Sequence, residues 1–168
     1  MVSSVSHPVD PSAEESLVDA DFCMPFPDSG MYAAVGYAQE SGLPYEIAMI
    51  RNHYVGRTFI QPSQGMRDFG VRIKLNPVKE MIQGKRIVII EDSIVRGTTS
   101  KEIVEMARQA GAKSVTFTSA APPVRYPHVY GINMPSRKEL VAAGRTIPEI
   151  TREIGADYLI YQEVEDMK

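Results

Sequence analysis

The sequence has little of what marks several classes of protein. Its 168 residues include one cysteine, Cys23, which excludes an internal disulfide bond, a zinc site built from cysteines and an iron–sulfur cluster with four cysteine ligands from this chain. No apolar run approaches the roughly 18–20 residues of a membrane span, and the first ten residues lack a basic region followed by an apolar one. We therefore expect no membrane association and a cytoplasmic location.

An excess of positive charge is also missing. The formal net charge is −3, the isoelectric point is near 5.6, and no basic block stands out. Because the field of the whole molecule repels nucleic acid, nucleic acid is not an expected partner. There is no internal repeat. Residues 1–16, rich in serine with proline and acids, are predicted to form a disordered leader, and residues 17–168 to form one domain with a single core.

The chain does contain a stretch typical of a ligand site, residues 86–99. Four consecutive β-branched residues in it predict a strand that is buried on both faces of a parallel sheet. Glu91 and Asp92 follow at the carboxyl end of this strand, and a loop with Gly97 leads into a helix predicted over 98–110. In open α/β sheets, ligands bind beyond the carboxyl ends of the strands, so this order of elements predicts a binding site.

The loop before the predicted helix has the features of an anion pocket. Thr99 and Glu102 have the spacing of a capping box, and Gly111 is placed to end the helix. The N–H groups of residues 96–99 open the helix, where the positive end of its dipole and the Thr98 hydroxyl add to their attraction for a phosphate. The two acids suit another part of the same ligand, so a sugar phosphate fits both halves of the stretch.

The same residues resemble the phosphoribosyl pyrophosphate (PRPP) signature of type I phosphoribosyltransferases. The resemblance lies in residues 88–99, Val-Ile-Ile-Glu-Asp-Ser-Ile-Val-Arg-Gly-Thr-Thr. The second half of this stretch resembles the sequence found in the amidophosphoribosyltransferase family. Residues 51–60, Arg-Asn-His-Tyr-Val-Gly-Arg-Thr-Phe-Ile, and residues 130–140, Tyr-Gly-Ile-Asn-Met-Pro-Ser-Arg-Lys-Glu-Leu, are similar to that family in the same order. The match, from residue 20 to about 162, implies a doubly wound, mainly parallel α/β sheet with helices on both faces.

The resemblance also implies two loops that act on PRPP. The turn Asp28-Ser29-Gly30 corresponds to a pyrophosphate loop, with Ser29 at the position of a Mg²⁺-associated hydroxyl. Residues 51–67 correspond to a catalytic loop that folds over the bound substrate; the length and polarity of this stretch also predict a functional loop. It departs from the family's common Lys-Asn-Arg-Tyr at two positions, where this chain has Arg51 and His53.

The implied site therefore contains three sets of residues, with Mg²⁺ as the cofactor. The implied catalytic residues are Arg51, His53, Tyr54 and Arg57. The implied substrate-binding residues are Asp28, Ser29, Gly30, Glu91, Asp92, Ser93, Val95, Arg96, Gly97, Thr98 and Thr99. The implied metal ligands are Ser29, Glu91 and Asp92.

The reaction implied by the resemblance joins PRPP and ammonia to give 5-phosphoribosylamine and pyrophosphate, the first step of purine nucleotide biosynthesis. The family takes its ammonia from glutamine in a domain whose nucleophile is an N-terminal cysteine. Position 2 is Val2, and no such domain is expected before residue 20. We therefore expect an ammonia-dependent enzyme at best, a separate glutaminase domain or subunit as a partner, and a homo-oligomer. Another departure is His128, which stands where some members have a cysteine that binds a cluster.

Two other functions stay open at this point. One is a nucleobase-salvage or orotate-type phosphoribosyltransferase, for which residues 126–155 would supply base recognition. The other is a non-catalytic PRPP-binding regulator or an inactive fragment.

Apolar patterns and turn residues predict the remaining elements. The stretch 64–75 is predicted as a helix, although its last five residues alternate as in a strand. The other predicted strands are 21–26, 45–50, 114–119 and 157–161, and the other predicted helices are 31–39, 136–143 and 147–154.

Overall fold

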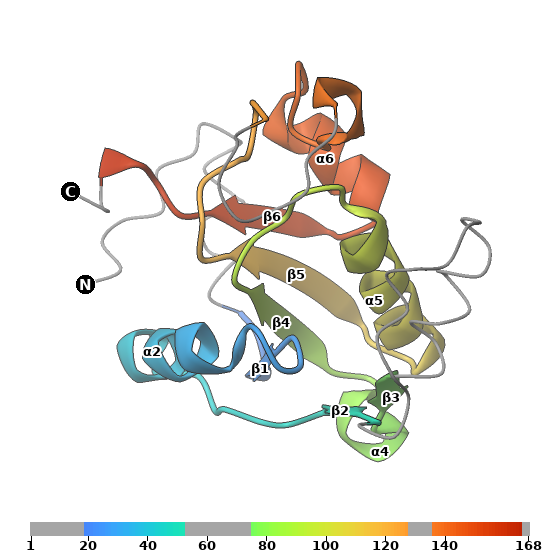
Figure 1. Cartoon of the computed structure of the whole chain (residues 1–168). Coiled ribbons are helices and arrows are strands. Elements are labelled where there is room, and N and C mark those ends of the chain that lie inside the picture. The colour runs from blue at the N-terminus through green and yellow to red at the C-terminus, as the bar shows by residue number, and fades with distance from the viewer. Residues whose placement is uncertain (1–18, 53–74, 128–135, 166–168) are drawn as a thin grey trace.

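The protein is described here by a computed structural model, which covers residues 19–52, 75–127 and 136–165 (Figure 1). Its centre is a four-stranded parallel sheet in the order β1-β4-β5-β6. Strand β4 lies between β1 and β5 and is buried along almost its whole length, as its apolar run predicts. The strands are β1 (Phe22–Pro25), β4 (Arg86–Glu91), β5 (Ser114–Ser119) and β6 (Tyr158–Tyr161).

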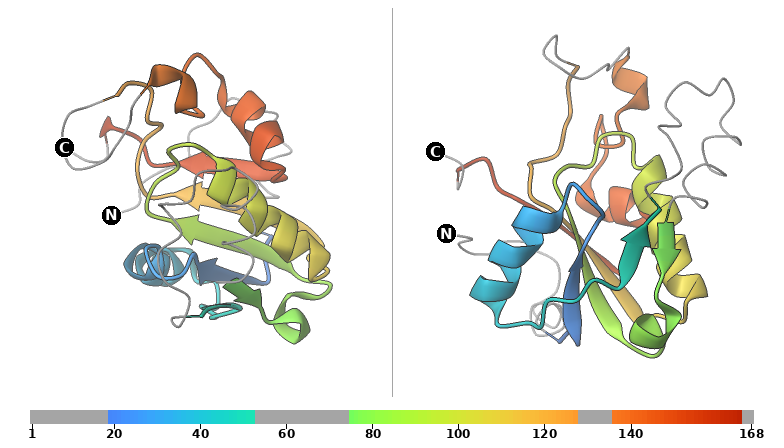
Figure 2. Two further views of the ribbon diagram at one scale, coloured as in Figure 1. Left: turned by 45° about the vertical axis from the view of Figure 1, so that its right-hand side comes forward. Right: turned by 60° about the horizontal axis from the view of Figure 1, so that its bottom comes forward.

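Helices cover both faces of the sheet. Figure 2 shows α2 (Met31–Ser41) on one side and α5 (Thr98–Gln109) on the other. The side chains of β4 alternate between these faces: Val88 and Ile90 pack with residues of α2, whereas Ile87 and Ile89 belong to the larger core. That core also holds the apolar stripes of α5 and of α6 (Ile147–Ile154).

The direction in which the chain adds strands to the sheet reverses beside β1. After α2, the Pro44 carbonyl accepts a hydrogen bond from Cys23 N–H at 2.9 Å, and Glu46 N–H donates to the Cys23 carbonyl at 3.0 Å. Tyr45 thereby forms a parallel bridge on the side of β1 opposite to β4. Crevices at such switch points are where open α/β sheets bind ligands. The loops after β1 and β4 flank this point.

The strand predicted over 45–50 is wrong in extent and pairing. Only Tyr45 bridges to β1; the chain then forms β2 (Met49–Arg51), antiparallel to β3 (Leu75–Pro77) in a separate two-stranded sheet. Val78 N–H donates to the Ala48 carbonyl at 2.8 Å. This carbonyl is therefore not available to extend the pairing with β1.

The region around β3 brings two further corrections. Leu75 begins this strand and does not end a helix, while residues 64–74 of that predicted helix lie outside the described residues. The short helix α4 (Lys79–Ile82) was not predicted, because four residues are too few to show a periodic pattern.

The helix predicted over 136–143 is also wrong. Only η1 (Arg137–Glu139), a single 3₁₀ turn, forms there. The next residues leave the helical path because Val141 N–H donates to the Val95 carbonyl at 2.9 Å, and Leu140 and Val141 are buried. Tertiary contact with the loop after β4 overrides the local pattern.

The predicted capping box at Thr99 is not formed either. Helix α5 starts at Thr98, and its N-cap is Gly97 in the left-handed conformation, with φ of 76° and no side-chain cap. Glu102 is instead buried on α5. A capping box does form at α6, where the Glu149 carboxylate accepts bonds from Thr146 N–H at 2.7 Å and from its hydroxyl at 2.8 Å.

Other predictions are confirmed. Strand β5 has the predicted bounds, the remaining strands of the main sheet agree to within one or two residues, and Gly111 and Gly155 end α5 and α6 with positive φ. Cys23 is fully buried. The leader predicted over 1–16 lies outside the described residues. Within the described ranges, no helix has both the length and the apolar character needed to cross a membrane.

Gly30, the N-cap of α2, and Gly36, inside this helix, allow a matched test of how its first turn packs. A Cβ on Gly30 would overlap the Ile90 carbonyl oxygen and lie 3.0 Å from Phe26 N, whereas a Cβ on Gly36 would meet nothing within 4 Å. We expect Gly30→Ala to lower the free energy of unfolding by about 2 kcal/mol or more, because backbone atoms must move. Gly36→Ala should raise it by up to about 1 kcal/mol. Urea unfolding measures both, and equal effects would contradict this packing.

Candidate active site

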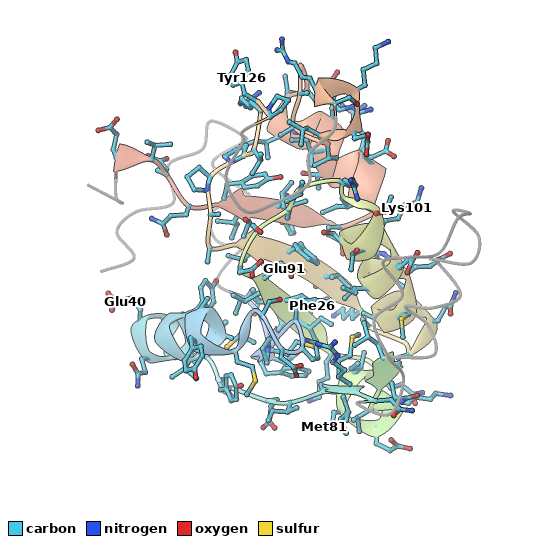
Figure 3. All side chains as sticks on the ribbon, viewed as in Figure 1. Phe26, Glu40, Met81, Glu91, Lys101 and Tyr126 are labelled. Atoms are coloured by element: carbon cyan, nitrogen blue, oxygen red, sulfur yellow. The ribbon has the colours of Figure 1, made fainter. Side chains whose placement is uncertain are left out.

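Two loops meet at the carboxyl ends of β1 and β4. Phe26 N–H donates to the Ile90 carbonyl at 2.7 Å, and Gly30 N–H donates back to the Phe26 carbonyl at 3.0 Å. These bonds fold the turn 28–30 over the end of β4, where the Ser29 hydroxyl donates to Glu91 Oε1 at 2.9 Å. Figure 3 labels Phe26 and Glu91 at this edge of the sheet. Two segments that the sequence assigned to one site are thus in direct contact.

The two acids after β4 are in different surroundings. Glu91 is only 7% exposed, whereas Asp92 is exposed and accepts a bond at 3.0 Å from the hydroxyl of Ser93. Burial raises the pKa of Glu91 to about 8, against the lowering effect of the Ser29 hydrogen bond and with a further rise from the Asp92 charge. Within the part of the chain that the structure describes, no cationic group is among the causes that set this pKa.

The loop after β4 ends in the first turn of α5. Thr98 and Thr99 are exposed there, and their N–H groups belong to the turn whose donors have no acceptor within the helix. The left-handed Gly97 turns the chain into the helix, so its backbone faces the same edge of the sheet as Glu91. Arg96 Nε pairs with Glu139 Oε2 at 3.1 Å. The anion pocket assigned to these donors stays a prediction.

The segment around Val141 packs against the other side of this loop, a contact that the sequence did not predict. Val141 bonds to the Val95 carbonyl, and a Cβ on Gly97 would lie 2.9 Å from Val141 Cγ2. Val141 lies more than 40 positions further along the chain, in the stretch 136–143 that the sequence predicts as a helix. No local signal in the sequence indicates the contact.

The structure describes one of the four predicted catalytic residues. Arg51, at the end of β2, pairs through Nη1 with Asp28 Oδ2 at 2.8 Å, which brings β2 to the turn 28–30. The other three, His53, Tyr54 and Arg57, lie outside the described residues.

The oxygen atoms at this edge of the sheet are of the chemical type that binds a magnesium ion. The described ranges contain no group of three His, Cys, Asp or Glu side chains placed to hold a metal. The Glu91 and Asp92 carboxylates and the Ser29 hydroxyl are nevertheless hard oxygen donors, and Mg²⁺ commonly binds one or two carboxylates, substrate phosphates and waters. A cation here would also offset the cost of the buried charge on Glu91.

Known proteins similar to this chain include amidophosphoribosyltransferases. No protein-family model matches the chain. Amidophosphoribosyltransferases from Synechocystis and from Archaeoglobus fulgidus are each 53% identical over 155 residues, 92% of this chain but 31% and 34% of theirs. A structure of the glutamine PRPP amidotransferase from Bacillus subtilis, complexed with ADP and GMP, superposes with a TM-score of 0.77 at 51% identity, covering 91% of this chain and 34% of that one.

These similarities confirm the resemblance seen in the sequence and the type I phosphoribosyltransferase fold. The chain spans about a third of the length of the relatives it matches.

The raised pKa of Glu91 predicts a pH-dependent stability. The ordinary pKa of 4.5 holds in the unfolded chain, so the folded state binds this proton more tightly and loses stability as the pH rises from about 4.5 through 8. Glu91→Gln should remove this loss and raise the free energy of unfolding at pH 9 by a few kcal/mol, at about 1.4 kcal/mol per pKa unit. Urea unfolding from pH 5 to 9 without divalent metal measures it.

The control is Glu153→Gln, which neutralises an exposed glutamate of α6. Its pH profile should parallel that of the unmodified protein. A Glu91→Gln profile with the same slope as the control would show that Glu91 is ionised in the free protein at neutral pH.

Proposed function

Because this chain is a relative of the amidophosphoribosyltransferases that matches about a third of their length, we propose that it is a PRPP-dependent phosphoribosyltransferase domain. The observation that carries the proposal is the hydrogen bond from Ser29 to Glu91 at 2.9 Å. It joins the loop assigned to pyrophosphate with the acids assigned to ribose at the switch point of the sheet. This contact supports the proposal that both halves of the implied site bind one ligand.

Each part of PRPP has a chemically suited neighbour. The first turn of α5, with residues 95–99 before and in it, offers N–H groups and hydroxyls to the 5′-phosphate. Glu91 and Asp92 accept hydrogen bonds from the ribose hydroxyls. The turn 28–30 leads into α2. Its Gly30 N–H is bonded to the Phe26 carbonyl, so the N–H groups of the first turn of α2 are the donors that suit the pyrophosphate.

Displacement of pyrophosphate from C1 builds positive charge on the ribose ring. Glu91, once ionised, stabilises that charge from a site with little water, where its field is weakly screened. Mg²⁺, when bound through Ser29, Glu91 and Asp92, supplies charge neutralisation of the leaving pyrophosphate. Arg51 is the described residue of the catalytic loop that is placed to add a positive charge beside the turn 28–30. His53, Tyr54 and Arg57 remain predictions from the resemblance.

The nitrogen donor that fits this chain is ammonia. The one cysteine, Cys23, is fully buried in β1 and its burial raises the pKa of the thiol, so it is no exposed thiolate that attacks glutamine. The proposed reaction is therefore PRPP with ammonia, giving 5-phosphoribosylamine and pyrophosphate for purine synthesis. A separate glutaminase domain or subunit, a homo-oligomeric state and a cytoplasmic location are further parts of the proposal.

The activity test uses the purified chain with PRPP, Mg²⁺ and a high concentration of ammonium salt at alkaline pH. We expect release of pyrophosphate and formation of phosphoribosylamine, with no turnover when glutamine replaces ammonia. Turnover with glutamine alone would contradict the assignment of the nitrogen donor. Equal pyrophosphate release with adenine, guanine or orotate would identify a salvage or orotate-type enzyme, and PRPP binding without turnover would identify a non-catalytic binder.

Removing both acids tests the ribose and metal assignment. The double variant Glu91→Gln with Asp92→Asn keeps the side-chain shapes, and we expect PRPP-dependent turnover to fall about 10²–10³-fold, the range for a charged catalytic group. The matched control is Glu40→Gln with Glu153→Gln, which removes two exposed charges from α2 and α6. Initial rates measure both. Similar small losses of turnover in the two variants would show that Glu91 and Asp92 only end a strand and do not act on the substrate.

A further inference from the structure

The loop that opens α5 contacts the segment 137–144, which consists of the single 3₁₀ turn η1 and the turns that follow it. Val95 accepts the bond from Val141 N–H at 2.9 Å, Arg96 pairs with Glu139 at 3.1 Å, and Gly97 packs against the Val141 side chain. Every one of these contacts is made by residues 139–141. The position of the loop therefore depends on where this segment lies.

The segment itself is fixed by few bonds of its own. Within it, Leu140 N–H donates to the Arg137 carbonyl at 3.2 Å and Ala143 N–H to the Leu140 carbonyl at 3.1 Å, both in turns. Gly144 then reverses the chain with φ of 73°. Turns of this kind do not hold a position without tertiary contacts.

Arg125 supplies such a contact from the chain that follows β5. Its Nη1 donates to the carbonyl oxygens of Ala142 at 3.3 Å and of Arg145 at 3.2 Å, so one guanidinium closes both ends of the turn 142–145. Arg145 Nη1 in turn donates to the Val141 carbonyl at 3.1 Å. Both Arg125 bonds come from the same Nη1, so a single charged group links the carbonyls at the two ends of the turn.

We infer that Arg125 is a positioning residue, which acts through the turn 142–145 and Val141 to hold the phosphate loop 95–99 in place. Arg125 has no contact with the loop among those described above, and its effect is passed on by the backbone of the turn. The inference rests on the proposed function for its ligand, because the loop is assigned there to the 5′-phosphate of PRPP. It adds a residue that no part of the resemblance assigned.

The first readout needs no ligand. We expect Arg125→Ala to speed hydrogen exchange of the Val141 amide about tenfold or more, while amides of β4 and β5 keep their protection. Arg125→Lys should restore part of the protection, since an ammonium group donates to a carbonyl without the fixed fork. Should Arg125→Ala fail to fold, Arg125→Lys carries the test.

A matched arginine serves as the control. Arg108 also bonds a backbone carbonyl, with Nε and Nη2 at 3.1 and 2.8 Å from the Gly155 oxygen, but it joins α5 to the end of α6. Arg108→Ala should leave the Val141 amide protected. Unchanged exchange at Val141 in Arg125→Ala, or equal acceleration in Arg108→Ala, would overturn the inference.

The second readout uses PRPP and ribose 5-phosphate. The loop is expected to bind the phosphate equally in the ground state and in the transition state. We therefore expect Arg125→Ala to raise the KM for PRPP about tenfold and to leave kcat nearly unchanged. Calorimetry should show weaker binding of ribose 5-phosphate. Faster exchange with unchanged binding would overturn the positioning role. An unmodified protein that binds neither ligand would overturn the proposed function instead, and the exchange data would still decide whether Arg125 holds the loop.

Discussion

The site depends on the close approach of Gly30 to the carbonyl of Ile90. That carbonyl accepts the bond from Phe26, and only a residue without a Cβ fits beside it. The approach puts the first turn of α2 directly over the end of the buried strand β4, and this is what brings Ser29 to Glu91. A larger residue at position 30 would separate the two loops and with them the two halves of the site.

Glu91 shows why stability and function pull in opposite directions here. Its burial raises the pKa to about 8, so the free protein is stabilised when this group is neutral. The proposed chemistry needs the same group charged, facing a cation and an electron-poor ribose. A ligand or metal that brings positive charge removes the penalty only when bound, so binding and ionisation of Glu91 are linked and each favours the other.

The sequence predicted best what is decided locally. The apolar run of β4, the stripe of α5 and the stop at Gly111 depend on neighbours a few residues away. It failed where distant segments compete for backbone groups: Ala48 pairs with Val78, and Val141 pairs with Val95. The strand–loop–helix pattern indicated Glu91, Asp92 and residues 96–99, and the resemblance supplied the other residues of the candidate site. The Ser29–Glu91 and Arg51–Asp28 contacts could be found only from the fold. His53, Tyr54 and Arg57 stay predictions.

The arrangement of charge limits what the site can bind. Helices α2 and α5 pack on opposite faces of the sheet, yet both begin at its carboxyl edge, at Gly30 and Gly97. Each offers N–H groups and the positive end of a dipole to an anion. Asp92, and Glu91 once it is ionised, lie between them and repel one. A ligand that satisfies all three has an anionic group at each end and a hydroxyl-rich, electron-poor centre, which is the charge pattern of the proposed substrate.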